Sequence, residues 1–199
     1  MVIHAVPGYA PPVEALFGLA NTPFEAVPFR AACERFGTFD ASSSDADLWY
    51  FSICGPRLIV GVSDAGAVRS AVLSICWWET FLPAEHPDRA SWEEERAEFD
   101  HCYAHELGAA TAVLGDPELV GQDQNADARR WAFWRGRTGL LILQQSAYDP
   151  QFGLDVNYWL HPWRGGKPRP GSPFIDWLFG VHGAEPAEPS AAADRGGSS

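Results

Sequence analysis

The segment Asp100–Glu106, with the sequence DHCYAHE, brings together two histidines, a cysteine and two carboxylates. His101 and His105 are four residues apart, a spacing that puts two imidazoles on the same side of a helix. Two such histidines can chelate a metal ion, and Glu94 or Glu98 could extend the ligand set. The segment therefore raises the question of a metal centre or a catalytic cluster.

Both chemistries need groups that this pattern does not supply. A zinc site recruits ligands from a second element, and the HExxH signature is absent because Glu106 follows the second histidine. Cys102 could act as a nucleophile beside a histidine, but no motif provides an oxyanion hole. We therefore expect no metal, no cofactor and no catalytic residue here, and interpret the segment as the solvent-facing side of a helix.

That helix is predicted over residues 91–114, with a capping box at Ser91 and Gly115 after its last turn. Its predicted buried stripe follows a helical spacing and consists of Phe99, Tyr103, Leu107, Ala110 and Leu114. Glu94, Glu98, His101 and His105 fall on the opposite side, whereas Cys102 lies closer to the core. The helix should pack on a sheet through the stripe.

Acidic residues are concentrated in and before this helix. The segment 79–106 holds nine acids and two bases, and so carries seven of the twelve net negative charges. The helix dipole accounts for acids in the first turn only. We expect an acidic surface that binds a basic protein partner; its predicted residues are Glu93, Glu94, Glu95, Glu98, Asp100 and Glu106. The remaining alternative is that the charge serves solubility alone.

The composition argues against other classes of function. A net charge of −12 repels nucleic acid, and no apolar stretch approaches the length of a membrane span. We find no export signal, and therefore expect a cytoplasmic protein with free thiols at Cys33, Cys54, Cys76 and Cys102. One lysine against 13 arginines, with abundant Ala, Gly and Pro, suggests a GC-rich bacterial genome.

The remaining pattern predicts an α+β fold with antiparallel sheet in the order α-βββ-α-βββ-α. Interrupted helix is expected up to Gly37, including a capping box at Thr22–Glu25, and residues 38–46 should form a loop. The predicted strands are 48–54, 57–62, 70–78, 130–135, 139–146 and 154–161. Short turns join each set of three into a meander, but the pattern does not decide between one sheet and two.

One domain is predicted over residues 1–182, ending in a short helix from Phe174, with a disordered tail over 183–199. In the strand 154–161, the alternation predicts Asp155, Asn157, Trp159 and His161 on a wetter face. Should the chain be an enzyme instead, its site is expected in the loops 116–129 and 147–153.

In element order, residues 11–182 resemble the type III secretion chaperone-like fold, with an added sixth strand. In acidity and tryptophan content the chain also resembles bacterial immunity proteins, with 9 Trp in 199 residues. Neither resemblance rests on a motif. The first implies a chaperone-like partner binder, and the second implies neutralisation of a toxin domain.

Overall fold

The computed structural model describes residues 2–3, 10–53, 55–79, 89–123, 129–146, 154–163, 165–166, 168 and 174–180. Side chains are described throughout these ranges except at 2–3, 77–79, 89–96 and 154. The chain divides into two units, Met1–Trp163 and Arg164–Ser199, and each is treated by itself below. The predicted domain end at residue 182 and the tail from 183 lie outside the described residues.

In the described part of the first unit, strands and helices follow one another along the chain. The strands are β1 (Val2–Ile3), β2 (Thr38–Phe39), β3 (Leu48–Ser52), β4 (Arg57–Val62), β5 (Val68–Glu79), β6 (Leu119–Gln122), β7 (Arg130–Arg135), β8 (Gly139–Gln145) and β9 (Leu154–Pro162). The helices are α1 (Val13–Ala20), α2 (Ala26–Cys33) and α3 (Arg89–Leu114). The second unit contains α4 (Phe174–Leu178), in which the rings of Phe174 and Trp177 are 5.4 Å apart.

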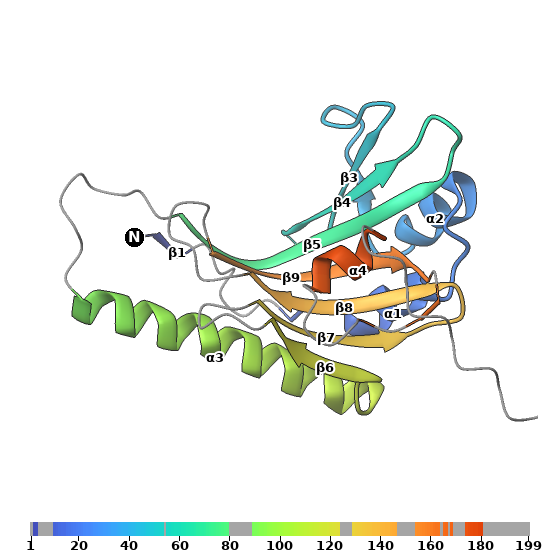
Figure 1. Cartoon of the computed structure of the whole chain (residues 1–199). Helices are drawn as coiled ribbons and strands as arrows, with labels where there is room; N and C mark the ends of the chain where they lie inside the picture. Colours follow the sequence, from blue (N-terminus) through green and yellow to red (C-terminus); the bar gives the residue numbers. More distant parts are fainter. Residues whose placement is uncertain are drawn as a thin grey trace, which may run out of the picture. The chain divides into compact units, whose positions relative to one another are not determined.

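The strands form one antiparallel sheet in the order β2-β3-β4-β5-β9-β8-β7-β6, with β1 also paired to β5 (Figure 1). The α+β class is thereby confirmed. The two predicted meanders are one sheet, because the middle of β5 pairs with β9, as in Leu73 opposite Tyr158. The predicted element order is only partly correct, because the described residues add the short strands β1, β2 and β6.

The first helices differ from the prediction in their boundaries. The expected capping box at Thr22 is wrong, because Thr22 follows α1 and its hydroxyl donates a hydrogen bond to the Gly18 carbonyl at 3.1 Å. Helix α2 begins later, at Ala26, with Glu25 in an extended conformation before it. Pro28 lies in the first turn of α2, where a missing backbone N–H removes no helical hydrogen bond.

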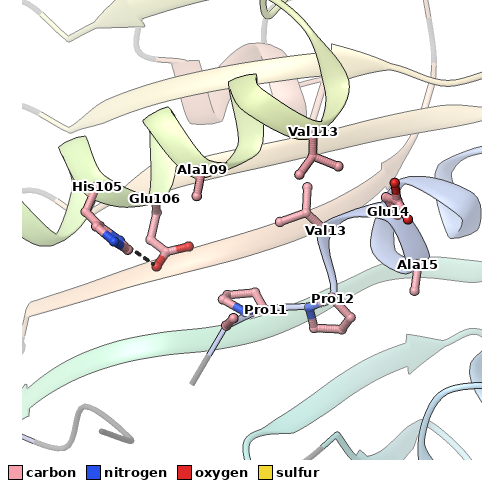
Figure 2. A pocket seen from close by; sticks show the side chains of 10 residues that line it. Pro11, Pro12, Val13, Glu14, Ala15, His105, Glu106, Ala109 and Val113 are labelled. Atoms are coloured by element: carbon pink, nitrogen blue, oxygen red, sulfur yellow. Dashed lines mark hydrogen bonds and ion pairs between the residues drawn. The ribbon is translucent and has the colours of Figure 1, made fainter. Parts of the chain in front are cut away.

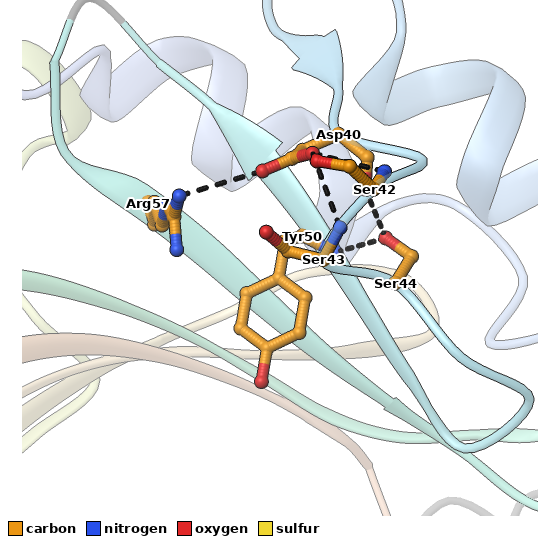
Figure 3. Close-up of polar contacts among 6 residues, drawn as sticks. All are labelled: Asp40, Ser42, Ser43, Ser44, Tyr50 and Arg57. Atoms are coloured by element: carbon orange, nitrogen blue, oxygen red, sulfur yellow. Dashed lines mark hydrogen bonds and ion pairs between the residues drawn. The ribbon is translucent and has the colours of Figure 1, made fainter.

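The predicted loop 38–46 begins with strand β2 and continues as a turn organised by Asp40 (Figure 3). Its Oδ1 accepts hydrogen bonds from Ser42 Oγ at 2.7 Å, from Ser42 N at 3.1 Å and from Ser43 N at 3.2 Å. Arg57 lies 3.4 Å from Oδ2. These hydrogen bonds, that from the Ser42 side chain above all, lower the pKa of Asp40 to about 2. The cluster closes a turn and we assign it no further role.

Helices α1 and α3 both pack against β8 and β9, and they also contact each other. The sheet residues beneath them include Leu141 opposite Leu160 and Leu143 opposite Tyr158, and all four are buried. These side chains share a core with Phe99 of α3. Helix α3 therefore contacts the sheet at β8 and β9, and α1 contacts the same two strands.

The other face of β8 and β9 is buried at several positions, so the predicted wetter face of β9 is only partly correct. Asn157 and His161 are each 3% exposed, and Gln144, which pairs with Asn157, is equally buried. Asp155 and Trp159 are partly exposed. Every residue of β8 is buried, which is typical of a strand covered on both faces.

None of the helices in the described part of the chain combines the length and the apolar composition that crossing a membrane requires.

Candidate functional site

The two predicted sides of α3 are confirmed where its side chains are described. Phe99, Tyr103 and Ala110 are buried in the core, whereas His101 and His105 are exposed. The imidazole rings are 6.5 Å apart. Among the described residues, no group of three or more His, Cys, Asp or Glu side chains is arranged to hold a metal ion.

The predicted partner-binding acids do not share one surface. Glu98 is exposed, and Glu93, Glu94 and Glu95 lie in the first two turns of α3, where side chains are outside the described set. Asp100, expected to be exposed, is half-buried and contacts the sheet.

The Asp100 carboxylate links α3 to two strands. Its Oδ1 accepts a hydrogen bond from Gln145 Nε2 at 2.9 Å, and Arg130 approaches both of its oxygens at 3.3 Å. Since Gln145 is only 1% exposed, this carboxylate provides a polar contact beneath the helix. Asp100 is therefore a structural residue in this fold, and its assignment to an open acidic surface is corrected.

Glu106 is likewise not on the exposed side, because it is only 5% exposed. It follows Phe99 by seven residues, and at 100° per residue the two lie within about 20° of each other on the helix. The helical spacing places Glu106 on the buried side, so its assignment to the surface acids is wrong. This correction identifies a buried acid on the core side of α3.

Glu106 lines a pocket of about 450 Å³ between α3 and the segment that leads into α1. Pro11, Pro12 and Val13 form one wall, while Ala109 and Val113 lie on the helix side (Figure 2). Figure 2 shows the Glu106 carboxyl group directed from α3 toward the two prolines. The pocket thus combines apolar walls with one buried acidic group.

The surroundings of Glu106 leave its carboxyl group incompletely paired. Oε1 lies 3.3 Å from Nδ1 of the exposed His105, but Oε2 is buried without a hydrogen-bond partner among the described residues. The Tyr158 hydroxyl, at 3.5 Å, donates to the backbone carbonyl of Glu106, and Glu14 also lines the pocket. Burial raises the pKa of Glu106, and interactions with His105 and the Tyr158 hydroxyl oppose that effect. An unpaired buried carboxylate is costly, so the group favours its neutral form or a cationic ligand.

The position of α1, which carries the opposite wall, is fixed by the turn between β7 and β8. Thr138 Oγ1 donates to the carbonyls of Ala20 at 2.9 Å and Thr22 at 2.6 Å. The Arg137 backbone N–H donates to Asn21 Oδ1 at 2.8 Å. These bonds satisfy carbonyls that the end of a helix leaves free, and they anchor α1 to the sheet.

The buried carboxyl group should make stability depend on pH. Its pKa is raised from the ordinary value of 4.5, so the folded protein holds this proton more tightly than the unfolded chain does. The stability that it contributes is complete below about pH 4 and is lost as pH rises through the folded-state pKa. Glu106→Gln should remove this loss. In urea unfolding, the free energy of unfolding of the variant should therefore rise relative to that of the wild type between pH 4 and 8.

Glu98→Gln is the matched control for this measurement, because it removes one charge from the exposed side of the same helix. Its stability difference from the wild type should stay within about 0.5 kcal/mol across the range. If Glu106→Gln and Glu98→Gln show parallel pH curves, Glu106 is not the buried group that the structure describes.

The loops predicted for an alternative enzyme site are only partly described. Residues 124–128 and 147–153 lie outside the described residues, and Leu119–Gln122 form strand β6. The first segment is therefore not simply a loop.

Comparison with known proteins gives no relative from which a role could be transferred: no family model, no curated protein and no solved structure matches the chain.

Proposed function

We propose that this protein is a cytoplasmic binding module for a basic protein partner, and that a cationic side chain of the partner enters the pocket at Glu106. A basic toxin domain or a secreted effector has the required charge, in line with the roles of immunity proteins and secretion chaperones.

The overall charge favours such a partner. The chain carries a net charge of −12, most of it from the segment 79–106, and Glu98 is exposed on α3. A field of one sign raises the association rate of an oppositely charged protein and discourages acidic ones. This attraction is non-specific, so the specificity must come from a defined pocket.

The observation that carries the proposal is the buried carboxyl group of Glu106 at the edge of an apolar pocket, where Oε2 has no hydrogen-bond partner among the described residues. An arginine or lysine side chain joins an apolar stem to a charged head. Its stem would lie against Pro12, Val13 and Ala109, while the head would pair with Glu106. Arginine suits the site better, because its guanidinium is weakly hydrated and forms paired hydrogen bonds to carboxylates.

A peptide pair provides a direct test. A heptapeptide with a central arginine between apolar residues would be titrated by calorimetry, alongside the same peptide with the uncharged isostere citrulline. We expect the arginine peptide to bind at least tenfold more tightly, because only it supplies a cation for Glu106. Its affinity should rise with pH through the raised pKa of Glu106, since the carboxyl group must ionise to pair.

Two variants separate the pocket from the general field. Glu106→Gln should lower the affinity for the arginine peptide by tenfold or more, because it removes one partner of a buried pair. Glu98→Gln should lower it less than about threefold, and added salt should reduce that effect. Equal affinity for the two peptides, or equal losses in the two variants, would contradict a role for the pocket.

A further inference from the structure

Two cysteines far apart in the sequence meet between the sheet and the long helix. Cys76 lies on β5 and Cys102 on α3, and their Sγ atoms are 2.7 Å apart across a sequence separation of 26 residues. The described residues hold a third cysteine, Cys33, which is buried elsewhere in the core. The pair plays no part in the proposed binding of a cationic side chain.

The two thiols differ in their access to solvent. Cys76 is 8% exposed, whereas Cys102 is half-buried, so a small reagent reaches Cys102 first. Cys76 then lies directly behind it, in the position of a resolving thiol. This combination of one accessible sulfur and one adjacent, protected sulfur is typical of cysteines that oxidise to an intramolecular disulfide.

The thiols also influence each other's ionisation. The hydrogen bond from Cys102 lowers the pKa of Cys76, since a neighbouring thiol stabilises the first thiolate to form. The same bond, together with burial, raises the pKa of Cys102. Glu98 and Glu106 act against both thiolates through their charge. The pair therefore behaves as one proton-sharing unit.

We propose that Cys76 and Cys102 form a thiol–disulfide site that oxidises with a hydroperoxide and ties α3 to β5. Cys102 passes its proton across the 2.7 Å contact to the Cys76 thiolate and attacks one peroxide oxygen, the O–O bond breaks, and the departing hydroxide takes up that proton from Cys76 to become water. Cys76 then attacks the resulting sulfenic sulfur as a thiolate, the S–S bond forms, and a second water leaves. The two thiols lose two electrons and two protons, and the hydrogen peroxide is reduced to two waters.

The bond would add a covalent link between β5 and α3. Cys102 lies between Phe99 in the core and Glu106 in the pocket, so the cross-link fixes the part of α3 that carries both. In a chain-entropy treatment, a cross-link over this separation raises the melting temperature by about 10 °C for a protein of this size. Oxidation should thus be visible as a gain in thermal stability.

The test uses the full chain with Cys33→Ala and Cys54→Ala, which leaves only the proposed pair. After stoichiometric hydrogen peroxide and removal of the excess, thiol titration in denaturant should fall from two groups to none. The intact mass should fall by two hydrogen atoms, and the protein should remain monomeric on a non-reducing gel. The melting temperature should rise by about 10 °C, and dithiothreitol should reverse the rise.

Cys76→Ser in the same background is the control, since it keeps the accessible sulfur without its resolving partner. It should gain oxygen or form a mixed disulfide, with no rise in melting temperature. Should the double alanine variant fail to fold, non-reducing peptide mapping of the oxidised wild type provides the same readout as a Cys76–Cys102 cross-linked peptide. Thiols that survive peroxide, or that are lost only through dimers between chains, would overturn the proposal.

Discussion

Phe99→Ala is expected to destabilise the protein by about 3–5 kcal/mol, among the larger losses that a single substitution can cause. Phe99 is only 1% exposed and belongs to the main core, where α3 meets the sheet. Removing its ring deletes apolar contacts and leaves a cavity that the surrounding strands cannot fully close. Urea unfolding monitored by tryptophan fluorescence would give the change in the free energy of unfolding.

His101→Ala is the matched control, because it truncates another ring two residues further along the same helix. His101 is exposed, so its loss should cost less than about 0.5 kcal/mol. Similar costs for the two variants would show that α3 buries a different side from the one described here.

The sidedness of α3 was predictable because it depends only on local spacing. A helix repeats every 3.6 residues, so one stripe of apolar residues determines which side is buried. The same rule placed Glu106 within 20° of Phe99, and the error lay in reading its charge as evidence of exposure. A polar residue in register with an apolar stripe is a signal for a site, because burying it without a partner is costly.

The pairing within each meander was also predictable, since short turns leave neighbouring strands little choice. The junction of β5 with β9 was not, because about 80 residues and the whole of α3 separate the two strands. The burial of Asn157 and His161 was missed for a related reason. Alternation identifies the two faces of a strand, but not whether the second face is covered.

The pocket itself could not be read from the sequence. Pro11 and Pro12 precede α1, and nothing in their types indicates that they face Glu106 on a helix about 90 residues later. Their position depends on the hydrogen bonds that Thr138 and Arg137 make to the end of α1. The pocket is thus a tertiary feature whose geometry depends on a tight turn at the other end of α1.

Gly136→Ala is therefore expected to disturb both stability and the pocket. A Cβ at Gly136 would collide with the Ala20 carbonyl oxygen and lie 2.7 Å from its carbonyl carbon and 2.9 Å from its Cβ. The obstacle is mostly backbone, so α1 must move away from the turn and strain the hydrogen bonds from Thr138. Overpacking of this kind costs about 1–3 kcal/mol, measurable by urea unfolding.

Gly108→Ala is the matched control, because it makes the same substitution where no atom lies within 4 Å of the new Cβ. Gly108 is exposed in the middle of α3, so alanine should raise the stability by about 0.5–1 kcal/mol through its better helix propensity.

The Gly136→Ala and Gly108→Ala variants should also differ in their affinity for the arginine peptide. Moving α1 shifts Pro12 and Val13 relative to Glu106. Gly136→Ala should therefore lower the affinity for the arginine peptide, measured at a temperature where the variant is folded. Gly108→Ala should leave that affinity unchanged. If Gly136→Ala is as stable as the wild type, the turn does not press on α1, and the wall of the pocket is held by other contacts.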